Sequence, residues 1–350
     1  LYSAYNKLFA EHWKGQTGQD VEVIQSHGGS GKQALEVANG NEADVVTLAL
    51  EYDVKAIQDA GLIEDGWINE FDKDSSPYTS TIVFLVRKGN PKNIKDWGDL
   101  VKDGVGVITP NPKTSGGARW NYLAAWAYAD KLYNGDETQI EAFIKKLYEN
   151  VLVLDSGARG ATTSFVENNQ GDVLIAWENE AFLSVQENPD EYEIVTPSIS
   201  ILAQPSVAVV DDVVDQRGTR NVATEYLSYL YSDEAQRIAG DNFYRPSNPD
   251  ILNEYADTFD LNINLVTIQD FGGWDEVQKK HFDDGGVFDR IYESKEEKSN
   301  TRFRTFNGRD NYNIELSCSY TVGGTCDLHI KNAPERYYRN NYTSACSCKF

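Results

Sequence analysis

The chain of 350 residues contains no methionine, and no cysteine precedes position 318. It also contains no run of about 18 apolar residues, so the sequence predicts no segment that inserts into a membrane. Basic residues are scarce, because 32 Lys and Arg stand against 55 Asp and Glu and leave a net charge of −23. A surface of that sign repels nucleic acids and anionic membranes, and we expect neither as a partner.

The composition is otherwise that of an ordinary globular chain, with 40% hydrophobic and 25% charged residues. The length favours about two domains. The chain opens at Leu1 in a segment whose apolar spacing is already helical, which is typical of a processed or truncated chain, and we expect an exported protein whose signal peptide is absent from this chain.

Residues 293–350 differ from the rest of the chain and are predicted to form a linker and a β-rich tail of unknown role. A charged run at 293–298 precedes two strand-like segments around a Gly-Gly turn, so we expect a β-hairpin within 313–330. All four cysteines lie here, and they permit two disulfides in three alternative pairings, a pattern compatible with export. They are Cys318, Cys326, Cys346 and Cys348.

Residues 1–292 alternate between strand and helix patterns, which indicates an α/β fold with a mostly parallel sheet. Helices are expected at 2–16, 53–60 and 115–132, and from about 32 and 158. Strands are expected at 21–24, 43–50, 80–86, 105–108, 151–154 and 173–176.

Two extended segments, 79–88 and 198–210, are interpreted as crossings between two lobes, which predicts hinge bending around a ligand cleft. The predicted lobes are 1–82 with 200–250, and 83–199 with 251–292.

Three Gly- and Ser-rich turns each follow a strand and open a helix, at 26–32, 114–118 and 156–160. The first N–H groups of a helix have no partner within the helix, and the helix end carries a partial positive charge. Glycine allows that backbone to approach a ligand closely, so such turns can bind an anion without Lys or Arg. The alternative is plain helix capping by serine.

Motifs for nucleotide binding and catalysis are incomplete. A phosphate loop would need Gly where Ser26 stands and Ser or Thr where Gln33 stands. A nucleophile elbow would need Gly in place of Lys32. The histidines show no metal-ligand spacing, so we expect no metal. Because the nucleotide and nucleophile motifs are incomplete, we also expect no enzyme activity and no cofactor. Trp177 ends a strand, where it either packs in the core or donates its indole N–H into a cleft.

Several segments together resemble the periplasmic sulfate-binding proteins of bacterial ABC sulfate importers over about residues 1–292. The segments that carry this resemblance are 14–21, 25–26, 43–50, 111–120, 155–160, 172–180 and 271–274.

The resemblance implies a two-lobed venus-flytrap fold of type II, with sulfate buried between the lobes. It further implies a periplasmic location and ABC permease subunits as partners, and we expect a monomer. The implied sulfate donors are the backbone N–H groups of the three turns, one hydroxyl and one indole. These residues are Ser30, Gly31, Gly116, Gly117 and Ala158 for the backbone, Ser115 for the hydroxyl and Trp177 for the indole.

Alternatives remain open. Thiosulfate is a second candidate ligand, because the sister family shares residues 111–115, although it departs in the first turn and at Trp177. A second alternative concerns the function: the protein could be a sulfate-sensing or adhesion module that uses the C-terminal tail. The family also has a strand ahead of its first helix, and without it the first lobe would lack a central sheet member.

Overall fold

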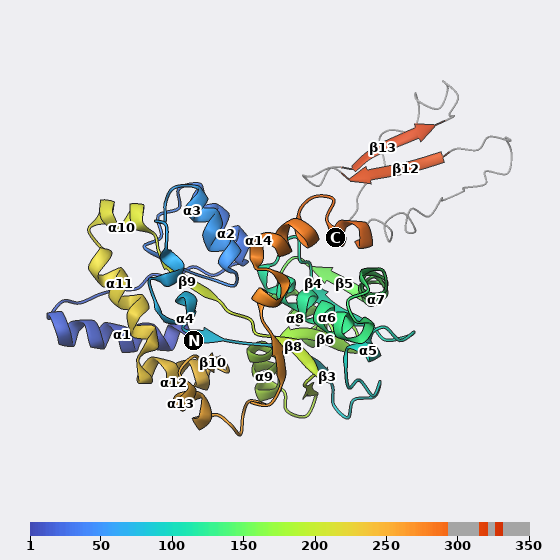
Figure 1. Cartoon of the computed structure of the whole chain (residues 1–350), viewed down its shortest axis with the longest axis horizontal. Coiled ribbons are helices and arrows are strands. Elements are labelled where there is room, and N and C mark those ends of the chain that lie inside the picture. Colours follow the sequence, from blue (N-terminus) through green and yellow to red (C-terminus); the bar gives the residue numbers. More distant parts are fainter. Residues whose placement is uncertain (293–314, 321–325, 332–350) are drawn as a thin grey trace. The chain divides into compact units, whose positions relative to one another are not determined.

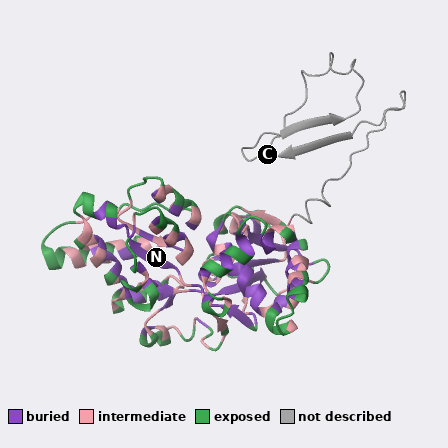
Figure 2. Cartoon of the chain, turned by 45° about the horizontal axis from the view of Figure 1, so that its top comes forward, coloured by how far each residue is buried: buried purple, intermediate pink, exposed green. Residues whose placement is uncertain are grey.

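The structure is a computed structural model that describes residues 1–292, 315–320 and 326–331. The chain divides into two compact units, Leu1–Ile291 and Tyr292–Phe350. In the first unit, buried residues follow the strands and the helix faces that cover them (Figure 1 and Figure 2). The bounds of the two lobes within this unit remain a prediction.

A five-stranded mixed sheet forms the centre of one part of the first unit. Strand β4 runs parallel to β5 and β6, whereas β3 is antiparallel to β6 and β7. The expectation of a mostly parallel sheet is therefore wrong. Strand β3 is the one that runs opposite to its neighbours. It joins the sheet directly from a crossing segment rather than through a βαβ unit, which would have made it parallel. In spatial order the strands are β5 (Val151–Asp155), β4 (Val107–Pro110), β6 (Val173–Trp177), β3 (Ile82–Arg87) and β7 (Tyr192–Val195).

Helices cover this sheet, and the longest of them has favourable capping residues at both ends. In the longest of them, Ser115 caps the N-terminus and Asn134 ends the helix in the left-handed conformation. Phe165 and Leu174 pack together in the core that these helices share with the sheet. The helices are α5 (Trp97–Leu100), α6 (Gly116–Tyr133), α7 (Glu137–Glu149), α8 (Ala158–Val166) and α9 (Glu178–Glu187).

The other part of the first unit is built around the antiparallel pair of β1 (Val45–Leu48) and β9 (Ser206–Val209). Tyr5 and Phe9 are fully buried, and their rings lie 5.1 and 5.0 Å from the ring of Tyr226. Around the pair lie α1 (Tyr2–Thr17), α2 (Ser30–Ala38), α3 (Glu51–Asp59), α10 (Asp211–Arg217), α11 (Arg220–Ser228) and α12 (Asp233–Asp241).

Shorter elements complete the first unit. They are α4 (Asp72–Ser75), β2 (Tyr78–Thr79), β8 (Ile199–Ile201), β10 (Arg245–Pro246), α13 (Pro249–Glu254), β11 (Asn264–Val266) and α14 (Trp274–Val277).

Residues 21–24 form no strand, which corrects the sequence-based expectation. The alternation that suggested a strand is real, because Val21 and Val23 pack against the core while the side chain of Ile24 is 90% exposed. Among the described residues no neighbouring strand pairs with this backbone, so the alternation orders the side chains without forming a ladder.

The two segments that the sequence predicts as crossings lie side by side. Ser80 and Ala203 exchange two backbone hydrogen bonds of 2.9 Å. Beside them, Thr81 Oγ1 donates to the carbonyl of Ile201 at 2.9 Å, and Ser200 Oγ donates to the carbonyl of Ile82 at 2.7 Å. These bonds tie the crossings together where they pass between the two parts of the unit.

The second unit contains β12 (Glu315–Tyr320) and β13 (Cys326–Lys331), which pair antiparallel as the predicted hairpin requires. Cys318 pairs with Leu328 in the backbone register, and Cys326 with Tyr320. Cys346 and Cys348, and the charged run at 293–298, lie outside the described residues. Within the described ranges, we find no helix with the length and apolar character of a membrane span.

His281 is a buried titratable residue that contacts Tyr122 of α6, so its titration reports on the packing of this core. It is 2% exposed, its Nδ1 lies 3.0 Å from the hydroxyl of Tyr122, and burial lowers its pKa from 6.5 to about 3. The folded protein thus binds fewer protons than the unfolded chain between these values, so this group costs stability as pH falls through about 6.5.

We expect the free energy of unfolding to lose about 1.4 kcal/mol per pH unit from this group between those pH values. Denaturant titrations of the wild type and of His281→Gln should therefore differ by an amount that changes with pH. A difference that stays constant from pH 7 to pH 4 would contradict the buried neutral imidazole.

Candidate functional site

The three Gly- and Ser-rich turns begin helices α2, α6 and α8, as the sequence predicts. Their N-cap residues Gly29, Ser115 and Gly157 are all extended, which turns the chain from a preceding loop or strand into the helix. Ser115 Oγ accepts the backbone N–H of Ala118 at 3.4 Å. Glycine and serine suit these positions because they favour the capping conformation and leave the backbone uncovered.

The second and third turns lie at one edge of the five-stranded sheet. They follow β4 and β5, and Trp177 ends the neighbouring β6, so three parallel strands deliver them to the same edge. Thr114 Oγ1 donates to the carbonyl of Ser156 at 2.9 Å, and this bond joins the two turns. Trp177 Nε1 donates to the carbonyl of Gly117 at 3.1 Å.

The first turn comes from the other part of the unit, and the Asp53 carboxylate that it contacts lies close to the second turn. Ser30 Oγ donates to Asp53 Oδ2 at 2.5 Å. A Cβ atom added to Gly116 would lie 3.0 Å from the same oxygen, and one added to Gly31 would lie 3.6 Å from Asp53 Oδ1. Trp120 Nε1 also donates to the carbonyl of Ala49 at 2.9 Å, which adds a second link between the parts.

The structure therefore brings the seven predicted residues into one cluster of turns. Ser30 is 9% exposed and Ser115 is 5% exposed, whereas Ala158 is exposed. Among the described residues, five backbone N–H groups of this cluster donate to no protein acceptor. They belong to Ser30, Gly31, Gly116, Gly117 and Ala158.

Asp53 is a buried carboxylate that sequence reasoning missed, so the expected lining of serine and tryptophan donors was incomplete. Burial raises the pKa of Asp53, while the hydrogen bond from Ser30 and the charge of Arg119 oppose the rise. Burial in turn lowers the pKa of Arg119, whose Nε donates to the carbonyl of Pro112 at 3.1 Å. The only sequence signal was an acid near a helix start, which is common on protein surfaces.

Lys113, which precedes the second turn, is held by acceptors outside the cluster. Lys113 Nζ lies 2.9 Å from the carbonyl oxygen of Phe282, 3.1 Å from Asp289 Oδ2 and 3.3 Å from Asp284 Oδ1. Its charge is thus balanced by two carboxylates.

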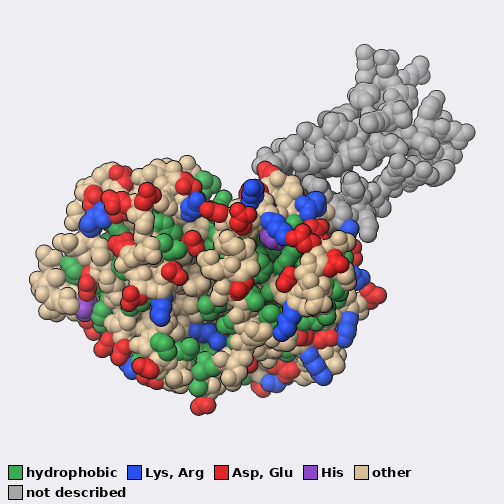
Figure 3. All heavy atoms as spheres, in the orientation of Figure 1, with side chains coloured by type: hydrophobic (Ala, Val, Ile, Leu, Met, Phe, Trp, Pro, Cys, Tyr) green, Lys and Arg blue, Asp and Glu red, His purple; other side chains and the backbone are tan. Residues whose placement is uncertain are grey.

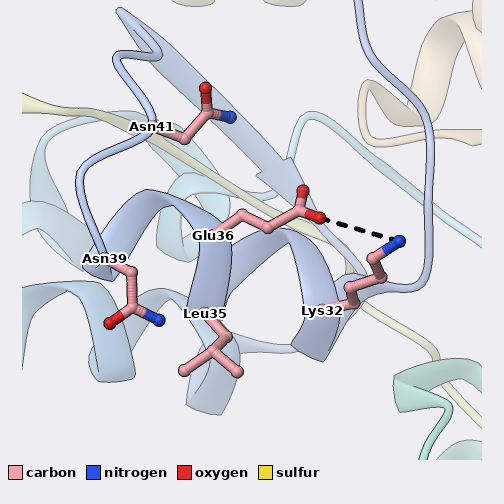
Figure 4. Close-up of a pocket in the computed structure, with 5 residues that line it drawn as sticks. All are labelled: Lys32, Leu35, Glu36, Asn39 and Asn41. Carbon is pink, nitrogen blue, oxygen red and sulfur yellow. Dashed lines mark ion pairs between the residues drawn. The ribbon is translucent and has the colours of Figure 1, made fainter.

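A shallow hollow on α2 is a separate feature (Figure 4). It contains one ion pair, Lys32 Nζ to Glu36 Oε1 at 3.6 Å, and the side chain of Leu35, which is 62% exposed. The hollow lacks the converging N–H groups of the turns. Acidic side chains are spread over the face drawn in Figure 3 rather than gathered in one patch. The described residues offer no group of three or more His, Cys, Asp or Glu that could hold a metal ion.

Comparisons with known proteins agree with this architecture. A family model described as bacterial extracellular solute-binding protein matches residues 1–245. The chain is 60% identical over 293 residues to the sulfate-binding protein of Escherichia coli K12, covering 83% of this chain and 89% of that protein. It is 49% identical over 294 residues to the thiosulfate-binding protein of Pseudomonas aeruginosa, covering 83% and 88%.

A solved structure is also similar. The sulfate-binding protein SubI from Mycobacterium tuberculosis H37Rv has a TM-score of 0.73 and 34% sequence identity, and the match covers 81% of this chain and 95% of that chain.

The packing of the turns can be tested with two glycine substitutions. Gly116→Ala places its methyl group 3.0 Å from Asp53 Oδ2 and 3.2 Å from Leu50, so we expect a loss of about 1–3 kcal/mol in the free energy of unfolding. Gly157→Ala is the matched control, because nothing lies within 4 Å of its added methyl group. Equal stabilities of the two variants in urea titrations would contradict the close packing of the first two turns.

Proposed function

Because this chain belongs to the bacterial extracellular solute-binding proteins, we propose that it captures sulfate and delivers it to the permease of an ABC importer. The observation that carries the proposal is the set of five backbone N–H groups that have no acceptor in the described part of the chain, on three helix N-termini that lie near one another. Helix N-termini that converge in this way favour a small anion.

Each predicted residue has a defined role in this proposal. The five N–H groups donate to sulfate oxygens, and Ser115 adds its hydroxyl, whose oxygen already accepts from Ala118 and so leaves its hydrogen free to donate. Trp177 exchanges the carbonyl of Gly117 for a sulfate oxygen. Sulfate is fully ionised near neutral pH and only accepts hydrogen bonds, which matches a set of donors.

The energetics of such a site are sufficient without a cation. Hydrogen bonds to a charged group contribute about 1.5–3 kcal/mol each, so seven donors exceed the binding energy of about −8 kcal/mol for micromolar affinity. Dehydration of the anion and closure of the lobes consume the surplus. The net charge of −23 slows capture only modestly, because salt screens it beyond about 8 Å.

We further propose that the protein works in the periplasm as a monomer and that it binds its ligand without transforming it. Thiosulfate is the second candidate ligand, since the thiosulfate-binding relative from Pseudomonas aeruginosa is 49% identical. Thiosulfate is also a tetrahedral dianion that accepts hydrogen bonds, so the same donors would hold it.

Calorimetric titration of the full chain with sulfate, thiosulfate and phosphate tests the proposal directly. We expect sulfate to bind more tightly than hydrogen phosphate by about 1–3 kcal/mol, because the phosphate O–H finds no acceptor in a set of donors. Phosphate that bound as tightly as sulfate would contradict this selectivity and would point to the Asp53 carboxylate as an acceptor. Absence of sulfate binding would refute the proposed function.

Ser115→Ala tests one donor. It removes the proposed hydroxyl, and we expect sulfate affinity to fall by about 1–3 kcal/mol in the same titration. Ser232→Ala is a matched control, since Ser232 caps α12 through Ala235 N at 3.2 Å in the same manner. The control should lose helix stability but keep its sulfate affinity. If the two variants bind sulfate equally, Ser115 is not a ligand.

A further inference from the structure

Glu178, the residue that follows Trp177 in the sequence, forms a buried ion pair with Arg245. Arg245 Nε donates to Glu178 Oε2 at 2.7 Å, and a terminal nitrogen of Arg245 donates to Glu178 Oε1 at 2.9 Å. The two side chains are 5% and 3% exposed. Two parallel bonds between planar groups fix their mutual orientation as well as their distance.

Further contacts hold both partners in place. The same nitrogen of Arg245 donates to the carbonyl of Asp260 at 3.0 Å, and its guanidinium carbon lies 5.2 Å from the ring centre of Phe259. On the other side, the backbone N–H of Glu178 donates to the carbonyl of Thr81 at 2.8 Å. Glu178 is thus anchored through its backbone and its side chain at once.

The ion pair connects the end of strand β6, where Trp177 lies, to a segment that is distant in the sequence. Trp177 ends β6 and precedes Glu178, the first residue of α9. Arg245 lies on β10, which pairs with β2 through Thr79. In the predicted division of lobes, Glu178 belongs to one lobe and Arg245 to the other, next to the crossing segments.

Stability alone is a weak reason for such a pair. Removing two charges from water is costly, and buried ion pairs often contribute no more than apolar side chains of the same volume. What an apolar pair lacks is a fixed orientation, and the residue next to Glu178 carries an indole whose direction decides which acceptor it reaches.

We propose that the Glu178–Arg245 ion pair positions Trp177, fixing the start of α9 so that the indole, which donates to the carbonyl of Gly117 in this structure, lies beside the anion site and can turn its N–H to the anion. This inference rests on the proposed function. Arg245 and Glu178 are positioning residues, since neither has to touch the anion.

Arg245→Lys is the central test, because it keeps the charge but replaces the planar two-point contact with a single ammonium group. We expect sulfate to bind at least about tenfold more weakly, a loss of about 1.4 kcal/mol. The fluorescence of Trp177, obtained by subtracting the spectrum of Trp177→Phe from that of the parent, should also shift. Arg237→Lys is the control, since Arg237 makes an equivalent two-point contact to Glu254 that is exposed. It should change neither quantity.

A double-mutant cycle separates positioning from a general structural effect. In the Trp177→Phe background, Arg245→Lys should cause no further loss of sulfate affinity, because the indole through which it acts is gone. Losses that simply add, or an Arg245→Lys variant with unchanged sulfate affinity and fluorescence, would overturn the inference.

A second variant covers the case in which Arg245→Lys fails to fold. Glu178→Leu combined with Arg245→Met removes both charges and leaves neither one unpaired. The inference expects this protein to fold and to bind sulfate weakly, and normal binding would overturn it. If the wild type binds no sulfate, the proposed function fails, while the fluorescence of Trp177 in Arg245→Lys still decides whether the pair positions the indole.

Discussion

The first backbone N–H groups of a helix find no acceptor inside that helix, and this chain directs three such ends to one place. Two of them reach it because β4 and β5 are parallel and therefore end at the same edge of the sheet, where β6 also delivers Trp177. The third, at Ser30, comes from the other part of the unit and bonds to Asp53, whose carboxylate lies close to Gly116. The strand directions, the crossing segments and the helix caps together place these three helix N-termini near one another.

Charge is kept away from the convergence or balanced there. Lys113 is engaged by Asp284 and Asp289, and Arg119 lies close enough to Asp53 for each to affect the pKa of the other. A site of neutral dipoles needs no counter-charge that must be neutralised again when the anion leaves. Five of the seven proposed donors are also part of the backbone, so they are oriented before the ligand arrives and lose little conformational entropy on binding.

Sequence patterns predicted the parts of this site that are local. The turn at Ser115 and the strand that ends at Trp177 are each encoded by neighbouring residues, and the structure places them as predicted. The antiparallel direction of β3 and the anchoring of Ser30 by Asp53 depend on residues far apart in the chain. The same is true of the Glu178–Arg245 pair, because 67 positions separate its partners. The local periodicity of the sequence cannot predict such long-range contacts. A resemblance to a family of known fold can indicate them.

The division of donors between the two predicted lobes has an energetic consequence. A ligand can shift the balance between open and closed forms only by its differential affinity for them. The donors of α2, at Ser30 and Gly31, meet those of α6 only when the lobes are together, and two bonds of about 1.5–3 kcal/mol supply about 3–6 kcal/mol of that difference. Shifting a population from mostly open to mostly closed takes about 5.5 kcal/mol. In the proposed function, the first turn thus contributes a large part of the energy that closes the lobes around the anion, while the second and third turns and Trp177 contribute the other five donors.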